Sequence, residues 1–101
     1  MTWADEHIRM LQNGDIIQFR PMGNSMKGKI DAGQLVTLRP CRGAGDLEVG
    51  NAVLCVVDGK PWLHFISAIK DRKFQIANAS GHVNGWTTAD KIYGVVTKVE
   101  N

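Results

Sequence analysis

The chain has little of what marks the most easily recognised classes of protein. It contains two cysteines and three histidines, and because none of their spacings suits a metal, a zinc site is not indicated. Nothing in the sequence around the two cysteines supports a disulfide. No apolar run approaches the length of a membrane-spanning helix, and residues 1–13 carry charges where a secretion signal needs apolar residues. The net charge is only +2 and the basic residues are scattered, which argues against a nucleic-acid surface. We therefore expect a cytoplasmic protein with no metal, no cofactor, and neither a membrane nor a nucleic acid as partner.

What the chain does have is a succession of short apolar runs separated by turn residues. Apolar residues at near-helical spacing ahead of Asn13-Gly14 predict one short helix over residues 3–12. Runs of strand type follow at 16–20, 34–38, 52–57, 62–69, 73–77 and 92–99, while 42–46 and 78–85 have the composition of loops. Many short strands with glycine-marked turns are typical of antiparallel folds. We expect one mainly β domain over residues 1–101, either barrel-like or built of two sheets, with a short N-terminal helix.

Two side chains are candidates for chemistry. Ser25 follows a glycine-bearing segment and precedes a strand, a position from which a hydroxyl can be presented as a nucleophile. The same serine could instead bond to its own backbone within a turn. His64 lies in a predicted strand, where a neutral imidazole can act as general base near pH 7 or can be a half-buried side chain that bonds to a backbone carbonyl.

Several segments, in a fixed order along the chain, resemble those of the signal-peptidase and LexA-like repressor superfamily of serine peptidases. That superfamily has a Gly-x-Ser-Met box, a Gly-Asp box before a strand, a second such box before a hairpin, and closing Asn-rich and Ile-x-Gly-x-Val segments. The corresponding segments here span 19–26, 30–36, 47–53, 75–78 and 92–96, so the resemblance covers roughly residues 16–99. It implies a small stand-alone member of the superfamily that acts on an extended peptide.

The resemblance also implies roles for individual residues. Ser25 would be the nucleophile, and His64, 39 residues later, falls where the superfamily places a lysine or histidine base. Asp90 is the carboxylate best placed to orient that histidine, although it could equally be an ordinary loop acid. The remaining candidates for an oxyanion hole or for substrate binding are Gly23, Asn24, Met26, Asn78 and Trp86. The loop around the last two could instead be a set of tight turns.

Several departures from the superfamily pattern leave activity open. Gln34 and Asn51 each replace an aspartate, Lys27 replaces a proline, and Phe65 replaces a basic residue. Gly23 offers no hydroxyl for the oxyanion hole, so backbone amides would have to serve alone. The alternative is therefore a catalytically inactive peptide- or protein-binding module of the same fold, of phage or plasmid origin.

A third hypothesis is an unattached repressor C-terminal domain, which would form a homodimer. We expect neither the membrane anchor of signal peptidases nor the DNA-binding domain of repressors. The sequence has no Ala-Gly dipeptide upstream of Ser25, so we do not expect self-cleavage of the repressor type.

Overall fold

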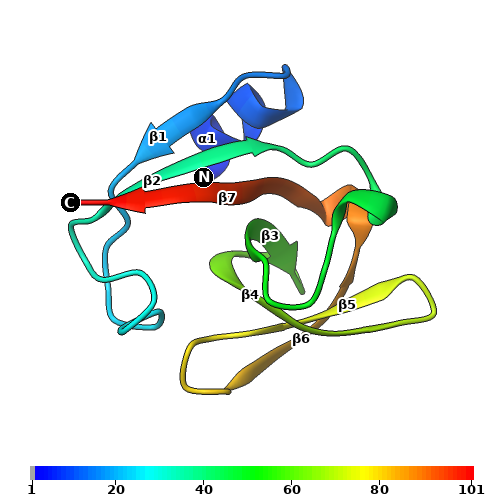
Figure 1. The fold of residues 1–101 in the computed structure, drawn as a ribbon. Helices are drawn as coiled ribbons and strands as arrows, with labels where there is room; N and C mark the ends of the chain where they lie inside the picture. The colour runs from blue at the N-terminus through cyan, green and yellow to red at the C-terminus, as the bar shows by residue number, and fades with distance from the viewer. Residues whose placement is uncertain (1) are drawn as a thin grey trace.

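The computed structural model describes residues 2–101 as one short helix and seven strands (Figure 1). In chain order they are α1 (Asp5–Gln12), β1 (Ile17–Phe19), β2 (Leu35–Pro40), β3 (Ala52–Val57), β4 (Lys60–Lys70), β5 (Lys73–Ala77), β6 (Val83–Thr88) and β7 (Ile92–Glu100), with short 3₁₀ helices at Ala44–Asp46 and Ala89–Lys91. No helix in residues 2–101 is both long enough and apolar enough to cross a membrane.

The strands form a single antiparallel sheet in the order β1-β2-β7-β3-β4-β5-β6. The mainly β prediction is confirmed. The expectation of a barrel or of two sheets is wrong, because the described strands form one sheet whose end strands, β1 and β6, do not pair with each other. The sheet does curl. The hydroxyl of Thr87 on β6 donates to the carbonyl of Val56 on β3 at 2.9 Å, which draws the far edge back over the middle of the sheet. In Figure 1, β2 and β7 accordingly lie above β3 and β4, with β5 and β6 below.

Most predicted strands appear within two residues of their expected bounds, and one strand was missed. The turn at Asp58-Gly59 has φ of 50° and 79°, the left-handed geometry that a two-residue hairpin requires. Residues 78–85 were predicted to be a loop, but β6 begins at Val83 and pairs with β5. The prediction failed because β6 is an edge strand with a glycine inside it, so it lacks the apolar alternation that marks strands with a buried face.

Two apolar clusters lie on the two sides of the curled sheet. The first contains Leu11 of α1, whose methyl groups contact the backbone at Gly94 so closely that a Cβ there would lie 2.7 Å from Leu11 Cδ1. The second fills the curl between β3 and β6 and contains Phe74 and Cys55. Burial raises the pKa of the Cys55 thiol to about 12, so this cysteine acts as a small apolar residue, as its sequence context indicated.

Candidate functional site

The site is built on the long connection between β1 and β2, residues 20–34, which lies at the left in Figure 1. Gly23 has φ of 95°, a conformation that a side chain would strain, and this turn leads directly into Ser25. The next residue, Met26, is buried and its carbonyl accepts the amide of Ile30 at 2.8 Å. A buried methionine therefore anchors the loop while the neighbouring serine is left at the surface.

A second loop holds Ser25 from the other side. The amide of Ala79, in the connection between β5 and β6, donates to the Ser25 carbonyl at 3.0 Å. That loop is shaped by Asn78, whose Oδ1 accepts the amides of Ser80 at 3.0 Å and His82 at 2.9 Å. Asn78, which sequence analysis offered as a substrate-binding residue, thus uses its side chain inside its own loop and affects Ser25 through the neighbouring amide.

His64 on β4 brings a base to the serine. Its Nε2 lies 3.0 Å from Ser25 Oγ, and its Nδ1 lies 2.6 Å from Oδ1 of Asn84 on β6. An amide oxygen can only accept, so Nδ1 carries the proton and Nε2 presents its lone pair to the serine hydroxyl. Three segments far apart in sequence therefore form one hydrogen-bonded chain, with the imidazole in the tautomer that a general base needs.

The surroundings of His64 favour its neutral form. The side chain is 2% exposed, and one face of the ring stacks on Trp62 with the ring centres 4.9 Å apart. Burial lowers the pKa of His64 below its ordinary value of 6.5, against a smaller upward effect of the Asn84 hydrogen bond. At pH 7 the imidazole is consequently available to accept a proton.

The residue beside Nδ1 is not the one that the resemblance implied. Asp90 lies in the second 3₁₀ helix and accepts a hydrogen bond from the hydroxyl of Thr88, two residues before it, while Asn84 occupies the position next to His64. Sequence analysis missed Asn84 because it read this stretch as loop. Its strand carries an irregularity opposite Ile76 and Ala77, and that irregularity sets which side chains of β6 face the histidine.

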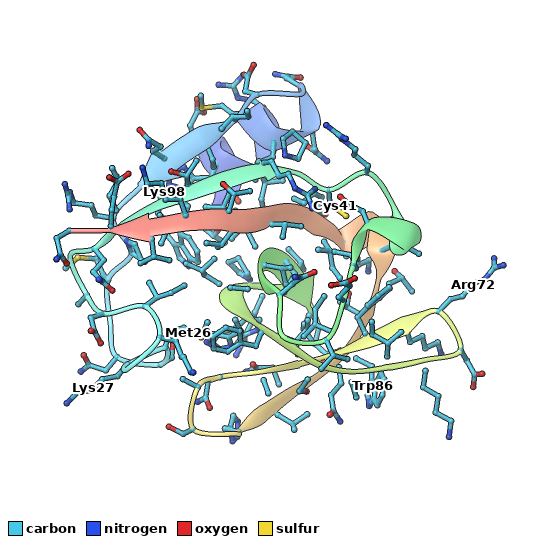
Figure 2. All side chains as sticks on the ribbon, viewed as in Figure 1. Met26, Lys27, Cys41, Arg72, Trp86 and Lys98 are labelled. Carbon is cyan, nitrogen blue, oxygen red and sulfur yellow. The ribbon has the colours of Figure 1, made fainter. Side chains whose placement is uncertain are left out.

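Ser25 and His64 open onto a pocket of about 510 Å³. Of the residues offered for an oxyanion hole or for substrate binding, Gly23 and Met26 line this pocket, whereas Asn24 and Trp86 do not. The side chains of Met26 and Trp86 lie well apart in Figure 2. The larger apolar contributors to the lining are Trp3, Phe19, Pro21, Met22, Ile30, Pro61, Trp62 and Leu63.

Three of the residues that depart from the superfamily pattern, Gln34, Asn51 and Phe65, have structural explanations. Oε1 of Gln34 accepts the amide of Asp31 at 2.8 Å, and Oδ1 of Asn51 accepts the amide of Glu48 at 2.8 Å. An amide oxygen does in each turn what a carboxylate oxygen could do, so these two replacements remove no group from the site. Phe65 packs against the first apolar cluster, beyond His64 on the same strand.

No cluster of three or more histidine, cysteine or acidic side chains suited to a metal occurs in the part of the chain that the structure describes. The site that the structure does show is a hydroxyl, an imidazole and an amide aligned beside an apolar pocket. Comparison of the chain with protein families, with curated proteins and with solved structures finds no match.

Proposed function

We propose that the protein is a serine hydrolase of the signal-peptidase and LexA-like type that cleaves an extended peptide with Ser25 as nucleophile. The observation that carries the proposal is the chain from Ser25 Oγ to His64 Nε2 at 3.0 Å and from His64 Nδ1 to Asn84 Oδ1 at 2.6 Å. A hydroxyl next to a base that a third group orients is the arrangement that activates serine for acyl transfer.

The reaction divides between these residues as follows. Ser25 Oγ attacks the carbonyl carbon, its proton passes to His64 Nε2, and the carbonyl π electrons move to the oxygen. Collapse of the tetrahedral species expels the amine, which takes the proton from Nε2 and leaves an ester on Ser25. Water then attacks the ester with the same imidazole as base, which releases the acid and regenerates the hydroxyl. Asn84 holds the ring in place through Nδ1 throughout.

Backbone amides at the nucleophile supply the donors for the negative oxygen. Within residues 2–101, the amides of Ser25 and Met26 donate to no protein acceptor, while those of Lys27 and Gly28 bond to the Asn24 carbonyl and to the side chain of Asp31. Free amides at the start of this turn are suited to an oxyanion, and one such donor is worth about 3 kcal/mol of barrier.

The substrate main chain would lie along β4. Residues 60–64 pair with β3 on one side, whereas β5 pairs with β4 only from Phe65 onward, so the other side of 60–64 has no partner strand among the described residues. This free edge ends at His64 and borders the pocket. An extended peptide added there would bring its carbonyl to Ser25.

The second candidate is a binding module without catalysis. It is favoured by Asn84, because a neutral amide stabilises the imidazolium that forms during reaction less than a carboxylate does, and by Gly23, which supplies no hydroxyl to the oxyanion. In this case the same strand edge and pocket would hold a peptide that is not cut.

Labelling with a fluorophosphonate distinguishes the two functions, because the reagent phosphonylates only an activated serine. We expect adduct on wild-type protein and none on Ser25→Ala, with Ser67→Ala as the matched control, since Ser67 is exposed and bonds to Gln75 away from the pocket. Absence of label on correctly folded wild-type protein would refute the hydrolase and leave the binding module.

A further inference from the structure

The pocket beside Ser25 is larger and more apolar than main-chain binding requires. We propose that it receives a large apolar side chain of the substrate, aromatic or long aliphatic, next to the bond that Ser25 attacks. That the bound molecule is a substrate rests on the proposed function. The preference of the pocket for one kind of side chain can nevertheless be measured without any cleavage.

Aromatic side chains from two separate parts of the chain form the walls. Trp3, just before α1, lies with its ring centre 6.1 Å from that of Phe19 on β1, and Phe19 in turn stacks on His7 at 4.2 Å. On the opposite side, Trp62 of β4 stacks on the base, His64. The pocket therefore extends from the catalytic imidazole to the N-terminal helix, and both ends offer ring faces.

Two of the apolar side chains at the pocket are unusually exposed. Trp3 is 53% exposed and Met22 is 90% exposed, although each lines the cavity and neither is needed to fill the core. Exposed tryptophan and methionine that surround a concavity are typical of a binding surface, since burial against a ligand recovers the apolar contact that water does not provide.

The charges of the pocket lining narrow the class of substrate side chain further. The pocket lining, all of it within residues 2–101, contains no aspartate or glutamate, and it includes the cationic side chain of Arg20, whose Nη1 donates to the Gly33 carbonyl at 2.6 Å. A lysine or arginine of a substrate would find no counter-ion there and would meet a positive charge instead.

The volume of the pocket favours large side chains over small ones. A space of about 510 Å³ lies within the range of about 300–1,000 Å³ that holds whole small ligands, so a single methyl group would leave most of it unfilled. The dispersion contacts of the ring faces would then have no partner atoms. A phenylalanine, tryptophan or leucine side chain contacts much more of the pocket wall than an alanine side chain does.

The test separates binding from catalysis. N-acetylphenylalaninamide, N-acetylalaninamide and N-acetyllysinamide are titrated into Ser25→Ala protein, with backbone amide shifts followed by NMR. We expect the phenylalanine amide to bind about tenfold more tightly than the other two, since partial burial of such a side chain is worth a factor of about ten. Trp3→Ala and Met22→Ala should each weaken that binding roughly fivefold. Trp86→Ala is the matched control, because Trp86 is 43% exposed but does not line the pocket.

Equal affinity for the three amides, or the same loss from Trp86→Ala as from Trp3→Ala, would overturn the inference. Met22 is at the surface, so its variant reports on the pocket even if Trp3→Ala disturbs the helix. Tight binding of the phenylalanine amide by a protein that a fluorophosphonate never labels would support the pocket and refute the hydrolase. Labelling without side-chain preference would do the reverse.

Discussion

Replacing Asn84 tests the hydrogen-bonded chain at the member that sequence analysis did not identify. Asn84→Ala removes the acceptor 2.6 Å from His64 Nδ1 and leaves a donor without a partner on a side chain that is 2% exposed. An unsatisfied buried donor costs about 1–3 kcal/mol. If the same energy is lost from the transition state because the imidazole is no longer held in place, the rate falls about 5- to 150-fold.

The variant to compare with Asn84→Ala is Asn84→Asp, which keeps an acceptor beside His64 Nδ1 and adds a negative charge. A carboxylate beside Nδ1 stabilises the imidazolium and raises the pKa of His64. The base acts when neutral, so wild-type reactivity should rise with pH through a midpoint below 6.5 and be level by pH 7. In Asn84→Asp the midpoint should move to higher pH.

The assay is the second-order rate of fluorophosphonate labelling between pH 5 and 8, with circular dichroism to confirm folding of each variant. Thr88→Ala is a suitable control, because Thr88 lies on the same strand and bonds to Asp90 instead of the histidine. If Asn84→Ala reacts at the wild-type rate and Asn84→Asp has an unshifted midpoint, Asn84 does not orient the base.

Three further predictions concern stability. Gly94→Ala places a methyl group 2.7 Å from Leu11 Cδ1, and urea unfolding should show a loss of about 1–3 kcal/mol; an unchanged midpoint would mean that α1 is displaced at little cost. Asn51→Ala removes the acceptor of a turn amide and should cost about 1 kcal/mol in the same assay, whereas Asn51→Asp should retain wild-type stability; equal losses would contradict the turn role. Burial lowers the pKa of both His7 and His64, so the unfolded chain binds more protons below pH 6.5 and stability should fall as the pH drops from 7 to 5. His64→Gln should make that fall shallower, by at most about 1.4 kcal/mol per pH unit, and an identical slope would show that His64 is not buried in neutral form.

Local patterns predicted the elements whose burial is regular. The run Ala52–Val57 and the hairpin that follows were identified because continuous apolar residues and an Asp-Gly turn are local signals. The pairing of β2 with β7 depends on contacts between residues about 60 apart, and the curl of the sheet depends on a hydrogen bond between residues 31 apart. No local pattern reports such contacts. The expected barrel was therefore wrong although nearly all its strands were present.

The same contrast holds for the candidate site, where some residues could be predicted from the sequence and others could not. Ser25 and His64 were identified because the resemblance carries them in order along the chain, and the structure places them in hydrogen-bond contact. Asn84 was missed because its position depends on an irregularity of the edge strand β6. Trp3 was predicted only as a helix residue, because nothing local indicates that the helix lies beside the loop that carries Ser25 and completes the pocket.

The most direct test of the central claim is to trap the acyl-enzyme. N-acetylphenylalanine p-nitrophenyl ester is mixed with stoichiometric protein, the reaction is stopped with acid within seconds, and the peptides are mapped by mass spectrometry. We predict an N-acetylphenylalanyl group on the peptide that contains Ser25 in the wild type and none on that peptide in His64→Gln. Acylation confined to lysines or to the N-terminal amine, or equal acylation of the two proteins, would contradict the account.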